Sequence, residues 1–460
     1  MASEDEVPTR QFLTTISRDL GIGSEIAANV RLSGSGNLPS VFAVSDFATA
    51  AVAAAGASVA QLIAARFGSK PPVTVDRRLS SLWFGWSIRP ENWTLPPAWD
   101  SIAGDYQTAD GWIRLHTNAP HHRAAALSVL GVAADKGEVA RVVANWKAEA
   151  LETAIVQSQG CAAAMRSTAA WATHAQGESV NREPLLAFRA TDDSGDSTMS
   201  STADRPLQGI RVLDLTRVLA GPVATRFLAG FGADVLRIDP PTWDEPSVIP
   251  DVTLGKRCAR LDLRASSGRA VLLDLLRSAD VLVHGYRSDA LDDLGLDTRT
   301  RRETRPGLVD VSLNAYGWSG AWRNRRGFDS LVQMSAGIAD TGMRMLGKDR
   351  PRPLPVPALD HATGYLLAAL VVRGLTQRIA TGRGFEGRAS LARTAQLLVS
   401  GPTGAVAGDL GRAEEKDWSE AIEATQFGPA RRLRSPLTVG DASMRWERPA
   451  AKLGSSPPTW

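Results

Sequence analysis

A regular alternation of apolar strands and helices between residues 209 and 317 constrains the fold of this chain more than any other feature. The strand-like segments include GIRVLDLT, ADVLRID, CARLDLR, DVLVHGY and LVDVSLNAYG, and between them lie helix-like segments such as GPVATRFLAGFG and SGRAVLLDLLRSA. Apolar strands that alternate with helices are typical of a parallel sheet covered on both faces. We therefore expect an α/β fold with a Rossmann-like parallel sheet, which binds ligands at the carboxyl ends of its strands.

The turn after the first of these strands disfavours several common ligands. It reads TRVLAGPV and lacks the spaced glycines that let a backbone approach the pyrophosphate of a nicotinamide or flavin cofactor. The chain also has no Walker loop, serine elbow or zinc-protease helix. A dinucleotide-dependent dehydrogenase is therefore disfavoured.

The stretch from Pro355 to Thr394 places one acid, Asp360, just ahead of an apolar helix. Residues 362–380 contain no proline, and leucines and valines recur at helical spacing up to TGRG, where the helix should end. At the amino end of a helix, exposed N–H groups and the helix dipole favour a charged carboxylate. Asp360 is thus a candidate nucleophile, and the alternative is an ordinary N-cap.

The rest of the chain divides by composition. We expect a polar segment (1–40), an alanine-rich helix with a tryptophan-rich connector (41–105), a small α+β domain (106–190), a polar linker (191–205), the large domain (206–400) and a connector with a closing segment (401–460). The alanine-rich stretch 47–65 comes nearest to a membrane span, but Ser58 and Gln61 interrupt it, and we interpret it as a packed helix.

Charge and cysteine content narrow the function further. The 52 Lys and Arg against 49 Asp and Glu leave a net charge of +3 without a basic, aromatic stripe, so we expect no nucleic-acid partner. Two cysteines exclude a disulfide framework, and three nearby histidines, His116, His121 and His122, lack carboxylates or thiolates at metal-ligand spacing. We expect no metal, no membrane association and a cytoplasmic location, because the polar amino terminus has no signal core.

Five segments carry a resemblance to a known family. In order they are PLQGIRVLDLTRVLAGPVATRFLAGFGADVLRIDPP, GKRCARLDLR, ADVLVHGYR, RPGLVDVSLNAYGWSGAWRNRRGFDSLVQMSAG and LDHATGYLLAALVVRGLTQRIATGRG. They resemble the large domain of the family III CoA-transferases, the CaiB/BaiF family, and they keep its order and spacing between residues 206 and 400. The resemblance implies a transferase that moves CoA from an acyl-CoA to a carboxylic acid, without a tightly bound cofactor and as a homodimer.

The resemblance also implies roles for individual residues. Asp360 matches the catalytic aspartate, which would form an aspartyl anhydride and then an aspartyl-CoA thioester. Arg264 and Arg287 would pair with CoA phosphates, and Asp329 would orient the substrate or cap the helix that follows it. The full set of implied CoA-binding residues is Arg217, Val218, Ala220, Leu261, Asp262, Arg264, Gly285, Tyr286, Arg287, Phe328 and Asp329.

Two alternatives stay open. The α-methylacyl-CoA racemases of the same family use a histidine in a GHD tripeptide, where this chain has Phe328, and phenylalanine cannot transfer a proton. A racemase is therefore less favoured than a transferase. Basic positions of the family correspond here to Pro240 and Asp293, which leaves a non-catalytic CoA-binding protein as the other alternative.

The amino-terminal half contains a second segment that resembles the stretch around Asp360. VSDFATAAVAAAGASVAQLIAARFG matches ALDHATGYLLAALVVRGLTQRIATG, with Asp46 and Asp360 separated by 314 positions (360 − 46). The segment similar to the family's small domain precedes the large domain, whereas in the family it follows the aspartate helix. We interpret the chain as the back half of one transferase joined to a second copy that lacks its small domain, with Asp46 as a relic. This order could place a complete catalytic unit in one chain.

Overall fold

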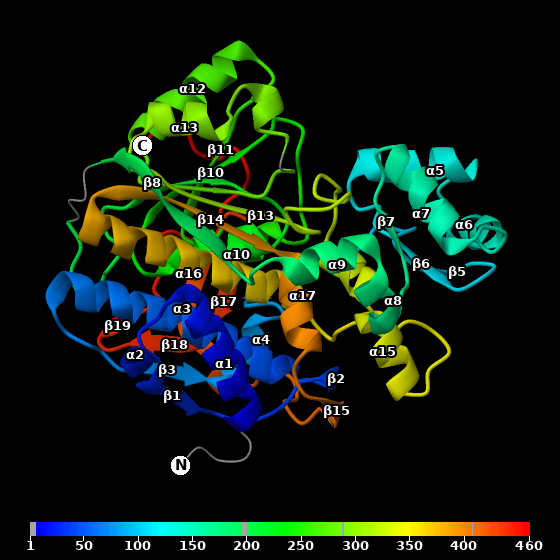
Figure 1. The fold of residues 1–460 in the computed structure, drawn as a ribbon, viewed down its shortest axis with the longest axis horizontal. Coiled ribbons are helices and arrows are strands. Elements are labelled where there is room, and N and C mark those ends of the chain that lie inside the picture. The colour runs from blue at the N-terminus through cyan, green and yellow to red at the C-terminus, as the bar shows by residue number, and fades with distance from the viewer. Residues whose placement is uncertain (1–5, 196–199, 288, 407) are drawn as a thin grey trace.

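A seven-stranded sheet forms the centre of the computed structural model, which describes residues 6–195, 200–287, 289–406 and 408–460 (Figure 1). Its order is β11-β10-β9-β12-β13-β14-β8, with the first six strands parallel and β8 antiparallel at the edge. This is the order of a doubly wound sheet, whose ligand crevice lies between β9 and β12. The strands are β8 (Ala187–Ser194), β9 (Arg211–Leu215), β10 (Asp234–Asp239), β11 (Lys256–Arg260), β12 (Val281–His284), β13 (Val309–Asn314) and β14 (Arg383–Ser390). The five strands expected from the sequence alternation are confirmed.

Helices cover both faces of this sheet. Helices α10 (Ala220–Gly230) and α16 (Ala358–Thr381) pack on one face, and α12 (Ser266–Arg277) and α13 (Thr298–Thr304) lie on the other. Strand β13 illustrates the division, because successive side chains point to opposite faces. Val309 and Val311 join the core around α16, whereas Asp310 and Ser312 face the opposite side.

Helix α3 (Val44–Phe67) packs along α16, as Figure 1 shows. Both helices have 24 residues, and their first and last residues are 314 positions apart (358 − 44 and 381 − 67). A strand and a capped helix follow each of them: β3 (Val73–Asp76) and α4 (Arg77–Trp83) after α3, and β14 and α17 (Leu391–Val399) after α16. The repeat is therefore present in three dimensions. The rearranged order relative to the family stays an interpretation.

Length and composition alone would let α3 cross a membrane, but 89% of the relevant window is buried inside the molecule. Its neighbours include α16, α1 (Val7–Leu20) and β3. It is the single helix of this kind in the described ranges.

The small domain has its own core and packs against the large domain. It consists of β5 (Gly104–Gln107), β6 (Trp112–Leu115), α5 (Pro120–Leu130), α6 (Lys136–Val143), α7 (Ala148–Gln157) and β7 (Ala162–Ala164). Strands β6 and β7 contact α14 (Asp329–Ser335). The Arg166 N–H donates to the Met334 carbonyl over 3.0 Å, and the Arg325 guanidinium donates to the Ala162 carbonyl over 2.8 Å. Helices α8 (Thr168–Thr173) and α9 (Ala175–Arg182) lead back to β8.

The expected linker is partly strand. Residues 191–194 belong to β8, which pairs with the free edge of β14, and residues 196–199 lie outside the described ranges. The polar composition of this segment predicted a linker, but polar side chains in it have partners in the fold. The Asp193 carboxylate accepts from Arg302 and from the Gly307 N–H.

The closing segment completes two smaller sheets. Strand β17 (Gly428–Leu433) pairs with β16 (Trp418–Thr425) on one side and with β4 (Ile88–Pro90) on the other. Strands β18 (Leu437–Val439) and β19 (Ala442–Ser443) extend the sheet of β3 and β1 (Val30–Ser33). The remaining elements are α2 (Ser24–Ala28), β2 (Ser40–Phe42), α11 (Ile249–Val252), α15 (Ile338–Met345) and β15 (Thr403–Val406), with short 3-10 turns at Asp292–Leu294 and Glu415–Asp417.

Candidate active site

Asp360 is the third residue of α16, and the helix N-cap is Pro357. The expectations that the helix starts after Asp360 and that Asp360 is an N-cap are therefore wrong. The helix begins earlier because the apolar pattern already includes Ala358 and Leu359, directly after a proline. A carboxylate in the first turn of a helix still lies in the favourable field of the helix dipole.

Asp329 binds the amino terminus of α16. One oxygen of its carboxylate, Oδ2, accepts the backbone N–H of Leu359 over 2.9 Å and that of Asp360 over 3.0 Å, while Oδ1 accepts from the Gln333 side chain. Asp329 is itself the first residue of α14, whose N-cap is Phe328. Asp329 thus caps α16 and not its own helix, which corrects the expected cap before SLVQMSAG.

Burial and like charge raise the pKa values of this carboxyl pair. Burial raises the pKa of Asp329 to about 6. Burial and then the neighbouring charge of Asp329 raise the pKa of Asp360 well above its ordinary value. Desolvation and repulsion therefore oppose the helix dipole, which by itself would favour the charged form of Asp360.

Asp360 and its repeat counterpart Asp46 differ in their partners. Within the described ranges the Asp360 carboxyl group has no hydrogen-bond or ion-pair partner, although the residue is only 7% exposed. The Asp46 carboxylate accepts from the Thr9 hydroxyl at 2.7 Å and from both terminal nitrogens of Arg77 at 2.7 and 3.0 Å. Asp46 is therefore held in a buried ion pair, whereas the Asp360 carboxyl group has no such partner among the described residues.

Two buried imidazoles of the small domain flank Phe328. The ring of His116 stacks on Phe328 with a centroid distance of 3.8 Å, and its Nδ1 lies 3.3 Å from the Ser330 hydroxyl. The ring of His122 approaches Phe328 edge-on at 5.9 Å. Burial lowers the pKa of each histidine to about 3, so both are neutral at pH 7. The sequence could not reveal this arrangement, because it depends on the packing of two domains.

No metal site accompanies these histidines. In the part of the chain that the structure describes, no group of three or more His, Cys, Asp or Glu side chains is suited to a metal ion.

The loops after β9 and β12 meet at the expected crevice. Arg217 donates to the Tyr286 hydroxyl over 3.1 Å, and its guanidinium lies over the rings of Tyr286 and Trp243 at 4.9 and 4.6 Å. The Arg217 Nε and Trp243 Nε1 groups are buried donors without an acceptor among the described residues. Both lie near the amino terminus of α10, so the cluster offers buried donors to an anion. The sequence did not predict a role for Trp243 at this crevice, because residues 243–246 (WDEP) match no ligand motif.

Val218 adds backbone strain at the same loop. Its φ angle is 64°, a left-handed conformation that is uncommon for a β-branched residue. The carboxylate of Glu245 accepts its N–H over 2.7 Å and also binds Arg237. A strained backbone conformation persists only where surrounding contacts hold it, and such conformations are often found at ligand sites.

The other implied CoA-binding residues are more scattered. Leu261, Asp262 and Arg264 follow β11, two strands away from β9, and no hydrogen bond or ring contact in the described ranges joins them to Arg217 or Tyr286. Arg264 is exposed, and its N–H donates to the Asp262 carboxylate over 3.0 Å. Ala220 begins α10 and contacts Gly364, so it connects the crevice to the aspartate helix. Gly285 is exposed next to Tyr286.

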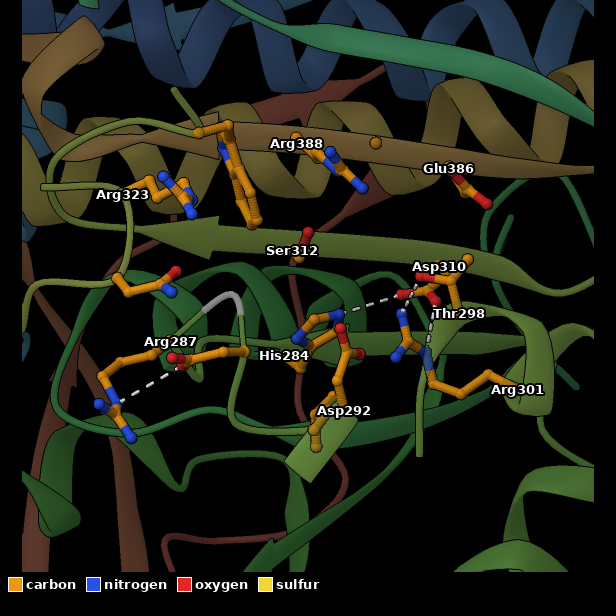
Figure 2. Close-up of a pocket in the computed structure, with 15 residues that line it drawn as sticks. His284, Arg287, Asp292, Thr298, Arg301, Asp310, Ser312, Arg323, Glu386 and Arg388 are labelled. Atoms are coloured by element: carbon orange, nitrogen blue, oxygen red, sulfur yellow. Dashed lines mark hydrogen bonds and ion pairs between the residues drawn. The ribbon is translucent and has the colours of Figure 1, made fainter. Parts of the chain in front are cut away.

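Arg287 lines a cavity of about 340 Å³ (Figure 2). The lining also includes His284, Ser312, Glu386 and Arg388, on the sheet face opposite α16. Asp360 is not among the lining residues, so this cavity is separate from the carboxyl pair.

Comparisons with known proteins find similarity to CoA-transferases. Residues 207–423 match the family model of CoA-transferase family III. An acetyl-coenzyme A transferase of Hypoxylon pulicicidum is 32% identical over 228 residues, which are 48% of this chain and 37% of that protein. The succinyl-CoA:glutarate CoA-transferase of Mus musculus is 30% identical over 195 residues, 39% of this chain and 44% of that protein.

A solved structure is also similar. The orthorhombic crystal structure of the Mycobacterium tuberculosis protein Rv3272 is 29% identical and covers 42% of this chain and 57% of that chain, with a TM-score of 0.39. The chain spans about half of the length of the curated relatives that it matches, or less. Residues 207–423, somewhat less than half of the chain, therefore resemble CoA-transferase family III.

Proposed function

We propose that this protein transfers CoA between carboxylic acids, with Asp360 as the nucleophile. The observation that carries the proposal is an unpaired carboxyl group in the first turn of α16, beside the junction of the large and small domains. The similarity to proteins named acetyl-coenzyme A transferase and succinyl-CoA:glutarate CoA-transferase supports the same reaction class.

The proposed reaction is a sequence of acyl exchanges. After Asp360 loses its proton, its carboxylate attacks the thioester carbonyl of an acyl-CoA; the C–S bond breaks and CoA leaves as the thiolate. The product is a mixed anhydride between the acyl group and Asp360. The CoA thiolate then attacks the aspartyl carbonyl of the anhydride, which releases the donor acid and leaves an aspartyl-CoA thioester. The carboxylate of the acceptor acid attacks this thioester in turn, and the returning thiolate completes the new acyl-CoA and frees Asp360.

Asp329 acts in this scheme as a positioning residue. It fixes the first turn of α16 through two N–H groups, and its negative charge makes Asp360 more basic. A more basic carboxylate is a stronger nucleophile once it is ionised, but a smaller fraction of it is ionised at a given pH. The reaction therefore needs a pH high enough to remove the proton from Asp360.

The crevice between β9 and β12 supplies groups for the phosphates of CoA. The buried, unpaired donors of Arg217 and Trp243 suit an anion, and α10 begins directly beside them. Pro240 stands where the family carries a basic residue, and Trp243 lies three residues after it. The indole N–H of Trp243 is therefore a hydrogen-bond donor close to the position that lacks the basic side chain. This arrangement favours CoA binding in spite of the replaced basic positions.

Trapping of the covalent intermediate tests the proposal. The protein is incubated with acetyl-CoA or succinyl-CoA and then with hydroxylamine or borohydride, and its peptides are analysed by mass spectrometry. We expect a modified residue at Asp360, and no modification in the Asp360→Asn variant. The matched control is Asp46→Asn, which changes the same position of the repeat and should leave Asp360 labelled. Labelling at another residue, or turnover by Asp360→Asn, would contradict the proposal.

A second candidate function, exchange of the proton on the carbon next to the acyl carbonyl, has one observation in its favour. The imidazole of His116 lies against Phe328, close to the position where racemases of this family have a histidine. Deuterium uptake from heavy water into an acyl-CoA, without labelling of Asp360, would support this reaction. If neither labelling nor exchange occurs, a non-catalytic CoA-binding role is favoured. The homodimer and the cytoplasmic location stay predictions.

A further inference from the structure

The cavity on the second face of the large sheet is not used by the proposed reaction. It has a volume of about 340 Å³ and lies over β12, β13 and β14, with α13 and the loop after β12 at its side. The core around α16 lies on the other face, so the sheet itself separates this cavity from the side of α16. A cavity of this size is within the range of small-molecule sites.

The charges in the cavity are divided between its two sides. Figure 2 shows Arg287 and Arg323 on one side, and Glu386, Asp310 and Arg301 on the other. Arg388 and Ser312 lie between them. The Arg301 guanidinium is bound to Asp310 over 2.8 Å, so its charge is neutralised within the far side. The Arg287 guanidinium likewise lies 3.9 Å from the Asp289 carboxylate. Arg388, between the two sides, has no carboxylate partner among the described residues, so it is the cation best placed to bind an anion, and the far side is rich in acceptors.

Two buried acceptors on the far side have no donor among the described residues. Nε2 of His284 lies 3.3 Å from the Asp310 carboxylate, which fixes the proton on Nε2 and leaves Nδ1 as a bare acceptor. The Glu386 carboxylate binds Arg189 through Oε2 at 2.8 Å, while its Oε1 is unpaired. Both residues are more than nine-tenths buried. A buried polar atom without a partner costs stability, so these atoms point to a ligand or water that donates to them.

We propose that this cavity binds a small organic acid that carries a hydroxyl or ammonium group at the end opposite to its carboxylate. The carboxylate binds to Arg388. The donor group hydrogen-bonds to His284 Nδ1 or Glu386 Oε1. Trp318, on which the Arg388 guanidinium stacks at 4.9 Å, forms the apolar wall for the carbon chain between them.

The loop after β12 connects this cavity to the crevice. Tyr286 faces Arg217 and Trp243, whereas Arg287, Asp289 and Leu291 line the cavity. A ligand that holds Arg287 restrains the neighbouring Tyr286. The bound acid therefore changes the affinity for CoA, and this consequence rests on the proposed function of the crevice.

A matched series of acids tests the binding directly. Isothermal titration calorimetry of the full-length Asp360→Asn variant, without CoA, compares 4-aminobutyrate, 4-hydroxybutyrate and butyrate, which share a carboxylate and differ in the distal group. We expect at least one of the two donor-bearing acids to bind at least tenfold more tightly than butyrate. Equal affinity of all three acids, or binding of none, would overturn the proposal.

Variants of one strand locate the site. Arg388→Met and Glu386→Gln should each weaken binding of the preferred acid at least tenfold, and Glu386→Gln keeps an acceptor for Arg189. Arg383→Met changes an exposed arginine of the same strand outside the cavity and should bind like the parent. Circular dichroism checks that each variant is folded. Loss of binding in Arg383→Met as well would count against the assignment.

Competition separates this proposal from the proposed function. If CoA or adenosine 3′,5′-bisphosphate displaces the acid stoichiometrically, the cavity is part of the CoA site and the proposal of a second site is wrong. Simultaneous binding, with a changed affinity of one ligand in the presence of the other, supports it. Covalent labelling of Asp360 is scored independently, so either proposal can fail alone.

Discussion

Asp360 and Asp46 occupy the same position of the repeated helix, yet their carboxyl groups have different partners. Arg77 and Thr9 satisfy the carboxylate of Asp46, and Arg77 is held in addition by Asn37. Asp360 has a second carboxylate, Asp329, as its nearest charge. Burial and the neighbouring carboxylate raise the pKa of Asp360 well above its ordinary value.

Removal of the charge of Asp329 tests this description. In the Asp329→Asn variant the pKa of Asp360 should fall, because the like charge is absent and the amide oxygen can still accept the N–H groups of α16. The midpoint of the pH dependence of Asp360 acylation should then move to lower pH by about one unit or more. Single-turnover labelling between pH 4 and 9 measures it. An unchanged midpoint would mean that burial alone sets the pKa of Asp360.

At this scale the sequence identified Asp360 as an acid at the start of an apolar helix, because that pattern is local. The family resemblance suggested Arg217 and Tyr286 as neighbours of CoA, and the catalytic and binding roles of all three residues stay predictions. The contacts of Asp329, His116 and Trp243 could not be found, because they join segments that are distant in the chain.

Among the elements, α16 depends on a close approach to α10. An added Cβ at Gly364 would lie 2.6 Å from the Ala220 carbonyl oxygen and 2.8 Å from the Val223 side chain. Ala50 occupies the corresponding position of α3 (364 − 314), so the glycine is required by this helix crossing and not by the repeat.

The Gly364→Ala variant should therefore lose stability although alanine is the better helix former. We expect the free energy of unfolding to fall by about 1–3 kcal/mol, because overpacking outweighs the helix propensity. Gly111→Ala is the control, since a Cβ there meets nothing within 4 Å. Urea denaturation of both variants measures the difference. Equal stability of the two variants would show that α10 can move away without cost.

The loop between β9 and α10 leads to a kinetic prediction. Replacing Arg217 by Met removes the buried donors expected to face CoA phosphates, so KM for an acyl-CoA should rise about tenfold, the effect of one charge-assisted hydrogen bond. The KM for the same acyl group on pantetheine, which lacks the nucleotide phosphates, should change little. A parallel rise for both substrates would indicate that Arg217 supports the loop and not the phosphates.

The elements themselves were largely predictable, and their boundaries and pairing were not. Hydrophobic runs identified β9 to β13, because buried parallel strands are continuously apolar. Strand β8 was missed because it is a polar edge strand whose pairing with β14 depends on a partner almost 200 residues away.

For the whole molecule, we expect the buried histidines to lower the free energy of unfolding as the pH falls. Burial lowers the pKa of His116, His122 and His361 to about 3, below the unfolded value near 6.5. As the pH falls from 6.5 to 3, the unfolded chain binds protons that the folded chain excludes, so the contribution of these groups to stability is lost. Asp329 acts in the opposite sense: its raised pKa favours the folded state below pH 4, and this contribution disappears as the pH rises through about 6.

His361 offers the clearest test of this balance. Neither of its ring nitrogens has a partner among the described residues, and the ring stacks on Phe84 at 5.2 Å. His361→Leu should keep or raise the stability at pH 7, because it removes two unsatisfied buried polar atoms. It should also reduce the loss of stability between pH 6.5 and 4. Chemical denaturation at several pH values measures both effects, and an unchanged pH dependence would contradict them.

The packing of α3 along α16 limits how copies of this protein can associate. The side of α16 that faces away from the large sheet is already occupied by α3, its repeat counterpart in the same polypeptide. A neighbouring molecule cannot dock there unless α3 is first displaced. That displacement would expose α3, which is almost wholly buried. Any assembly must therefore be built from the outer surfaces, and dilution or cross-linking should leave the surroundings of Asp360 intact.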